Sequence, residues 1–153
     1  MANTKDYQDA IVEATRVDDD IKLVEAILEY FSAVENVTFL PLKRIKSFFV
    51  AARSTDSEAW KDLSDKEALA VENILAWTGH SPNTIAVVLR TYERSTPELR
   101  QAQQDGRLSR YPAESISRLY KGTLKDLQPR LIEMYLRYGI TNEDLRKLVP
   151  PVP

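Results

Sequence analysis

The 153-residue chain contains no cysteine, one histidine and only four glycines. Without cysteine it has neither disulfides nor thiolate metal sites, which excludes disulfide-stapled secreted proteins. A single histidine also leaves no ligand set for a transition metal. No stretch approaches the roughly 18 consecutive apolar residues that cross a membrane, and the polar N-terminus lacks the apolar segment of a signal peptide. We therefore expect a cytoplasmic protein that does not enter a membrane.

The motifs of familiar catalytic sites are also missing. The sequence has no G-x-S-x-G nucleophile turn, no phosphate-binding loop and no H-E-x-x-H motif. The acidic run Asp18-Asp19-Asp20 suits a helix start, where negative charge is favoured, better than a cation site, which needs spaced oxygen ligands. A catalytic pair among the 23 acidic residues would have no recognisable pattern. We predict no enzymatic activity, no metal and no cofactor.

Apolar residues recur at helical spacing along most of the chain. The one strand-like stretch, NVTFLPL, is interrupted by Pro41. A second apolar stripe follows Pro41 and predicts another helix. The sequence therefore predicts an all-α protein, a compact bundle of about seven to nine short helices that contains a helix-turn-helix. The strongest stripe predicts a helix over about residues 18–35 and consists of Ile21, Val24, Ile27, Leu28 and Phe31.

Several polar residues have the spacing of helix starts. In a capping box, a Ser or Thr and an acidic residue three positions later satisfy each other's backbone N–H groups. A Ser or Thr followed by proline is a similar signal, because proline suits the first helical turn. We expect Pro112 to begin a helix in the same way. The expected starts are Thr55/Glu58, Ser64/Glu67, Ser81-Pro82, Thr96-Pro97, Thr123/Asp126 and Thr141/Asp144.

Charge divides the chain unevenly. Residues 1–78 have nine Lys and Arg against fifteen Asp and Glu, whereas residues 79–121 have seven against four and residues 122–153 five against four. An acidic surface repels nucleic acid, and clustered Lys and Arg attract it. We expect an acidic N-terminal helical region over residues 1–62, a region over 63–149 that forms one compact unit with it, and a Pro-rich tail over 150–153.

The stretch TGHSPNTIAVVLRTYE, residues 78–93, has the layout of a helix-turn-helix. A helix ends at Gly79 and a second helix starts at Ser81-Pro82, as in units whose second helix enters the major groove. The first helix usually has a small residue four positions before the turn glycine, and here that residue is Leu75. The side chains expected to face the bases are Ser81, Asn83, Thr84, Val87, Thr91 and Arg94.

Each of these residues has a simpler interpretation as well. Asn83 and Thr84 also suit a plain helix start. We expect Arg90, Arg94, Arg107 and Arg110 to contact phosphates, but Arg90 could instead bridge Glu93 or Glu98, and Arg107 and Arg110 could belong to a solvated face.

A longer pattern continues from this unit to residue 119. It has a G-x-S at the start of the second helix, then L-R, then P-E, a distal G-x-L-S and an alanine. This pattern resembles the DNA-binding segment of the ParB partition-protein family and its plasmid and phage relatives. The arginine-rich nucleotide-binding motifs of that family are absent, so the resemblance implies only the DNA-binding module. The matching residues are Gly79, Ser81, Leu89, Arg90, Pro97, Glu98, Gly106, Leu108, Ser109 and Ala113.

The sequence therefore predicts a sequence-specific binder of double-stranded DNA, associated with the nucleoid, and not an enzyme. The resemblance implies a transcriptional regulator or a partition-type accessory factor of a plasmid or phage. The alternative is a helical inhibitor or adaptor that binds a protein partner through its acidic N-terminal half, since a fold does not determine a function. We also expect a homodimer formed by the stripe of residues 21–31 or the helix of residues 124–136, unless the core of one chain buries both.

Overall fold

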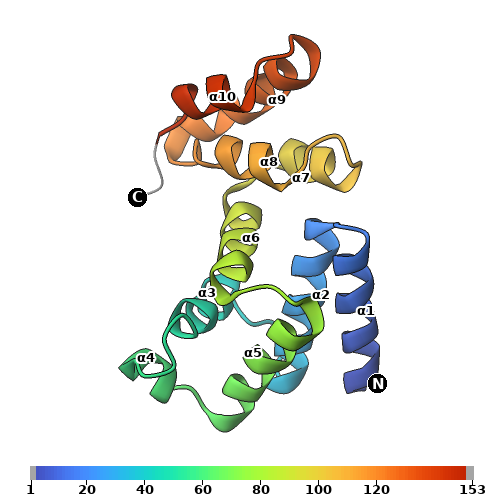
Figure 1. Ribbon diagram of the computed structural model, residues 1–153, viewed down its shortest axis with the longest axis vertical. Coiled ribbons are helices and arrows are strands. Elements are labelled where there is room, and N and C mark those ends of the chain that lie inside the picture. Colours follow the sequence, from blue (N-terminus) through green and yellow to red (C-terminus); the bar gives the residue numbers. More distant parts are fainter. Residues whose placement is uncertain (1–2, 151–153) are drawn as a thin grey trace. The chain divides into compact units, whose positions relative to one another are not determined.

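A computed structural model describes residues 3–150 and shows an all-helical protein, as the sequence predicts (Figure 1). This part of the chain has ten α-helices, slightly more than expected, and no strand. In chain order the helices are α1 (Thr4–Arg16), α2 (Asp20–Val34), α3 (Leu42–Ala51), α4 (Glu58–Lys61), α5 (Asp65–Thr78), α6 (Pro82–Arg94), α7 (Pro97–Gln104), α8 (Arg110–Ser117), the 3₁₀ helix η1 (Gly122–Leu127), α9 (Gln128–Arg137) and α10 (Asn142–Leu148).

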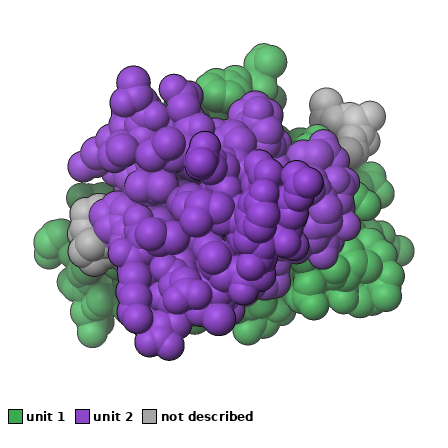
Figure 2. Space-filling view, turned by 90° about the horizontal axis from the view of Figure 1, so that it is seen from above, with its two compact units in different colours: residues 1–89 green, residues 90–153 purple. Residues whose placement is uncertain are grey.

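The helices form two compact units, residues 1–89 and residues 90–153 (Figure 2). The boundary between the units falls inside α6. The regions expected from the sequence meet at residue 62, and α5, which follows this point, packs with α1, α2 and α3 in the first unit. Residues 151–153 of the expected Pro-rich tail lie outside the described residues.

The first unit packs around an aromatic centre. α1 lies against α2, and both contact α5 (Figure 1). Phe31 is 0% exposed, and its ring centroid lies between 5.6 and 6.0 Å from those of Tyr30, Phe48 and Phe49. Such tilted and edge-on ring pairs add to the stabilisation that burial alone provides. The apolar stripe of residues 21–31 is used in this core, except that Leu28 remains half-buried.

The second unit has an aliphatic core with a polar residue enclosed in it. Gln128, at the start of α9, is 0% exposed. Its amide nitrogen donates to the carbonyl oxygens of Arg94 and Leu119 at 2.8 and 2.9 Å, and its oxygen accepts from the Thr96 N–H at 2.8 Å. Gln128 therefore joins the ends of α6 and α8 to the start of α7. The core consists of Leu99, Ala102, Leu108, Ala113, Ile116, Leu119, Leu131, Ile132, Leu145 and Val149.

Local hydrogen bonds set most helix starts where the sequence predicts them. Ser64 and Glu67 form both bonds of a capping box, at 3.1 and 2.9 Å. The box of Thr141 and Asp144 forms as well. Asp19 caps α2, which confirms the interpretation of the acidic run as a helix start. Thr96 caps α7, and Pro97 begins that helix as predicted.

Two expected capping boxes are wrong. The cap of α4 is Ser57, not Thr55, because the Ser57 hydroxyl accepts the Trp60 N–H at 3.1 Å while residue 55 lies in a turn. Thr123 opens no α-helix, because residues 122–127 form the tighter 3₁₀ helix η1. The α-helix begins only at Gln128, where the following proline suits a first turn whose N–H groups have no helical partner.

The expected start of α8 is wrong by two residues. Ser109 occupies the cap position and the helix begins at Arg110, so Pro112 is its third residue. Proline is compatible with this position because the first N–H groups of a helix have no partner within it.

Candidate nucleic-acid interface

A short left-handed turn separates α5 from α6. Gly79 has a φ of 71°, a conformation that glycine adopts without strain. Its N–H donates to the carbonyl oxygen of Leu75 at 2.9 Å and so closes the last turn of α5. Residues 79–81 alone join the two helices, and α6 begins at Pro82 as the sequence predicts. The N-terminal end of α6 thus follows directly after a tight turn, as in a helix-turn-helix unit.

Two of the expected reading residues hold the start of α6 together. The Ser81 hydroxyl oxygen accepts the backbone N–H of Thr84 at 3.1 Å. The two side-chain hydroxyls also lie 2.9 Å apart. Ser81 is exposed and Thr84 is half-buried. Their capping role supports the simpler interpretation for Thr84, although the exposed Ser81 hydroxyl still reaches solvent.

Asn83 differs from its two neighbours. Its side chain is exposed and has no hydrogen-bond partner among the described residues. An amide group offers donors and an acceptor side by side, which is the arrangement that pairs with the adenine edge in a major groove. Unlike Ser81 and Thr84, Asn83 therefore has a side chain that forms no hydrogen bond within the described residues and is available to a ligand.

The later residues of the expected reading face turn away from solvent. Val87 is half-buried, and Thr91 is only 3% exposed. The expectation that Thr91 faces outward is wrong, because it follows the buried Val88 by three residues and residues at that spacing share a helix face. The Thr91 hydroxyl is buried with no hydrogen-bond partner among the described residues. The accessible reading face is therefore limited to the first turn of α6.

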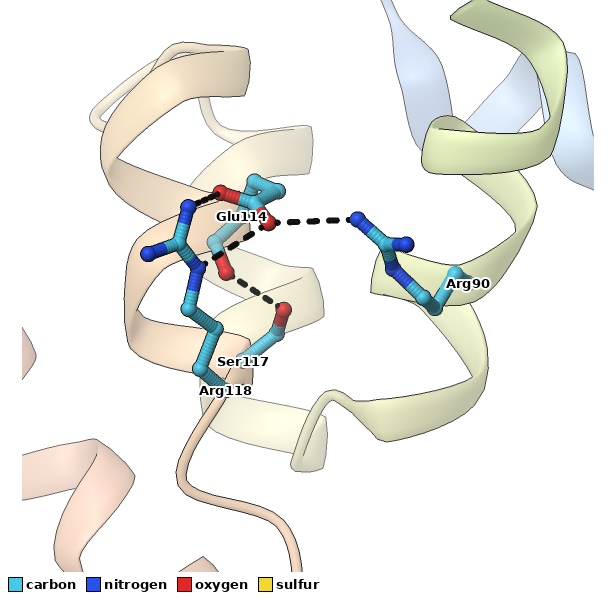
Figure 3. Close-up of polar contacts among 4 residues, drawn as sticks. All are labelled: Arg90, Glu114, Ser117 and Arg118. Carbon is cyan, nitrogen blue, oxygen red and sulfur yellow. Dashed lines mark hydrogen bonds and ion pairs between the residues drawn. The ribbon is translucent and has the colours of Figure 1, made fainter. Parts of the chain in front are cut away.

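Arg90 is bound to a carboxylate within the second unit. Its Nη2 lies 3.3 Å from Oε1 of Glu114 on α8, a residue that is 9% exposed (Figure 3). Arg118 holds the same carboxylate through Nε and Nη2, at 3.1 and 2.9 Å. Burial lowers the pKa of Arg90 from its usual value, and the charge of Glu114 opposes this shift. Arg90 remains a cation, since arginine does not lose its proton in proteins.

The structure shows Arg90 paired with Glu114, a residue that its sequence neighbourhood does not indicate. Glu114 lies 24 residues away, compared with the nearby Glu93 and Glu98. The four-residue spacing of Glu114 and Arg118 is visible in the sequence and typical of a helix pair. The pairing with Arg90 has no such local signal, because it depends on how α8 packs in the second unit.

The other expected phosphate contacts also have partners or are partly enclosed. The guanidinium carbon of Arg94 lies 4.0 Å from the centre of the Tyr120 ring, a cation–π geometry. Arg107 is exposed, and its Nη2 lies 3.3 Å from Oδ2 of Asp105. Exposed pairs of this kind are weak, so Arg107 exchanges partners easily. Arg110 begins α8 and is half-buried.

The described residues contain no group of three or more histidine or acidic side chains that could hold a metal ion. None of their helices is long and apolar enough to cross a membrane. In comparisons with known proteins, the chain matches no family model, no curated protein and no solved structure.

Proposed function

We propose that the protein binds double-stranded DNA sequence-specifically and inserts the start of α6 into the major groove. Its cellular role would be that of a transcriptional regulator or a partition-type accessory factor of a plasmid or phage. The observation that carries the proposal is Asn83, an exposed amide without a partner among the described residues, in the first turn of a helix that follows a glycine turn.

Three features support this function together. Residues 79–81 form a tight turn between two helices, as a helix-turn-helix requires. Residues 82–89 contain no charged side chain, so the first turns of α6 can enter the major groove of DNA without burying a charge. The resemblance of residues 79–119 to the ParB family points to the same module, although it covers only that segment.

Replacement of Asn83 tests the proposal directly. In Asn83→Ala, selection from random duplexes should return a relaxed base preference, and affinity for the preferred site should fall by about 1–3 kcal/mol. The thermal midpoint should change little, because the side chain is exposed and unpaired within the described residues. Selection of unchanged sites with unchanged affinity would contradict the assignment.

A matched control is available at another helix start. Asn142 is the exposed first residue of α10. Asn142→Ala should leave both the selected sites and the affinity as they are in the original protein. An equal loss in both variants would mean that Asn83 acts through general stability rather than through base contact.

We expect the DNA-bound form to be a dimer, because one short helix reads few base pairs and paired helices usually lie about one turn, ~34 Å, apart. The stripe of residues 21–31 is buried in the first unit. In the segment of residues 124–136, by contrast, Leu124, Leu127 and Leu136 are exposed. That segment is the remaining candidate contact. Sedimentation equilibrium tests it: a strict monomer at tens of micromolar, free and on DNA, would exclude the dimer.

The protein-binding alternative is favoured by one observation, the exposed acidic side chains of α1 and α2. Asp9 and Glu13 are exposed on α1, and Glu25 and Glu29 on α2. A surface of this kind suits a basic protein partner and repels DNA. Binding to duplex DNA distinguishes the two functions, because only the first requires it. Absence of duplex binding at low salt would reject the DNA-binding function and favour the protein-binding one.

A further inference from the structure

The acidic first unit contains one segment of opposite charge. Residues 1–89 have nine Lys and Arg against fifteen Asp and Glu, yet residues 42–54 include four basic side chains and no acidic one. These residues form α3 and the turn that follows it. α3 packs against α5, the helix that leads into the turn before α6. The basic segment therefore belongs to the same unit as the first turns of α6.

Three of the four cations line one groove. A hollow of about 510 Å³ beside α3 and α4 is lined by Lys43, Lys46 and Arg53, with the hydroxyl side chains of Ser54 and Ser57. Lys43 and Arg53 are exposed and have no partner among the described residues. The rest of the lining is largely apolar and includes Val50 and Ala51, and the Ser57 hydroxyl already donates to the Ala51 carbonyl oxygen and accepts the Trp60 N–H. The groove therefore offers a nucleic-acid phosphate mainly the charge of its Lys and Arg side chains.

The fourth cation has a structural task. Nη2 of Arg44 lies 3.0 Å from Oε2 of Glu67, the residue that completes the capping box of Ser64 at the start of α5. Glu67 is buried, so this pair helps to fix α3 on α5. Arg44 does not line the groove and is therefore not counted among its three cations.

The groove provides positive charge, which the start of α6 lacks. Residues 82–89 have no charged side chain, and most affinity for DNA comes from cations that neutralise phosphates. The arginines that the sequence suggests for this task belong to the second unit, where Arg90, Arg94 and Arg107 have partners within the chain. Lys43 and Arg53 are without partners among the described residues and lie in the unit that carries Asn83.

We propose that the groove of Lys43, Lys46 and Arg53 binds the phosphate backbone of the duplex whose bases α6 reads. This inference rests on the DNA-binding function proposed above and adds a second contact surface to it. The cations of the α3 groove supply affinity without regard to sequence, whereas Asn83 supplies base preference.

The test is a double variant, Lys43→Ala/Arg53→Ala, measured on random-sequence duplex between about 50 and 200 mM salt. Each phosphate contact contributes about 0.9 to the slope of log affinity against log salt, so the slope should become shallower by about two units. Affinity at about 0.1 M salt should fall more than tenfold. The sites selected from a random library should not change, because Asn83 is intact.

Lys5→Ala/Lys22→Ala is the matched control. Both lysines are exposed in the first unit on α1 and α2, so the control removes the same charge from a different surface. Its salt slope should equal that of the original protein. If the groove variant and the original protein had equal salt slopes, the proposal that the groove binds phosphates would be rejected, whereas the proposal that α6 contacts bases would stand. Absence of duplex binding by the original protein would overturn both proposals. Urea unfolding of each variant verifies that the fold is intact.

Discussion

The two units differ both in charge and in what fills their interiors. The first has six more acidic than basic side chains and an aromatic core around Phe31. The second has twelve Lys and Arg against eight Asp and Glu, an aliphatic core and buried polar groups such as Gln128 and Glu114. A net positive charge makes the second unit the expected partner of DNA, but its arginines are largely occupied within the chain.

Charge excess and available charge are therefore different quantities. In the second unit, Arg90 and Arg118 share the single negative charge of Glu114, and Arg94 covers an aromatic ring. In the first unit there are fewer cations, but those of the α3 groove are gathered on one surface. Of these, Lys43 and Arg53 have no partner among the described residues, and surface cations bind phosphate readily when no carboxylate competes for them. The net charge of a unit therefore does not indicate how many of its cations are available to a polyanion.

The largest effect is expected in the aromatic core of the first unit. Phe31→Ala should lower the free energy of unfolding by about 3–5 kcal/mol, because it removes a fully buried ring from three ring contacts. Urea unfolding followed by tryptophan fluorescence reports on this unit, since Trp60 and Trp77 both lie in it. Phe39→Ala is the control: this ring is 75% exposed, and its loss should cost less than about 0.5 kcal/mol.

The next effect is expected at the buried amide of the second unit. Gln128→Leu leaves the polar groups of Arg94, Thr96 and Leu119 without their partner, and the free energy of unfolding should fall by about 2–4 kcal/mol. Circular dichroism during urea unfolding measures this loss, since the unit has no tryptophan. Gln104→Leu, at an exposed position on α7, should change stability by less than about 0.5 kcal/mol. A comparably small effect of Gln128→Leu would show that buried polar groups do not hold this unit together.

A smaller effect is expected at the shared carboxylate. Glu114→Gln removes the charge that two half-buried arginines face, and should cost about 1–2 kcal/mol because both arginines still reach some water. Glu133→Gln provides the comparison, since Glu133 forms an exposed pair with Arg137 at the same four-residue spacing and should change little. Equal losses would mean that burial of the Glu114 pair has no consequence.

The smallest effect is expected from two neighbouring carboxyl groups of the first unit, and it depends on pH. Burial, followed by the hydrogen bond and charge of Glu67, raises the pKa of Glu35. Burial of Glu67 is outweighed by its bonds to Ser64, Glu35 and Arg44, so the pKa of Glu67 is lowered. A raised carboxyl pKa means that the folded protein favours the protonated form. The stability from Glu35 is therefore full below its unfolded pKa and is lost as pH rises through its folded pKa.

Glu35→Gln mimics the protonated form at every pH. The variant should be more stable than the original protein at about pH 7, and the difference should shrink toward about pH 4, near the ordinary carboxyl range. The pKa of Glu67 is shifted in the opposite direction. Its contribution to the free energy of unfolding is therefore present above its unfolded pKa and is lost as pH falls through its folded pKa. Glu72→Gln, at an exposed position on α5, should show no such pH dependence. Tryptophan fluorescence during urea unfolding at each pH measures both variants.

Local chemistry made much of the fold predictable. The caps at Asp19, Ser64, Ser81 and Thr141 form as the sequence indicates, because each bond joins residues only three positions apart. The same reasoning failed at Thr55, where Ser57 offers a nearer hydroxyl. It placed residues 4–16 only within a helical region and gave no bounds for this helix, since α1 buries only Ile11 and Ala14.

The helical class, most helix starts and the exposed position of Asn83 could be predicted from the sequence, since these depend on neighbours within one or two helical turns. Which charges remain available depends instead on tertiary contacts. Arg90 meets Glu114 across 24 residues, and Gln128 meets Thr96 across 32. Lys43, Lys46 and Arg53 share a groove because of how α3 and α4 pack. Contacts between distant residues follow from the burial of side chains in a core, which no local pattern encodes.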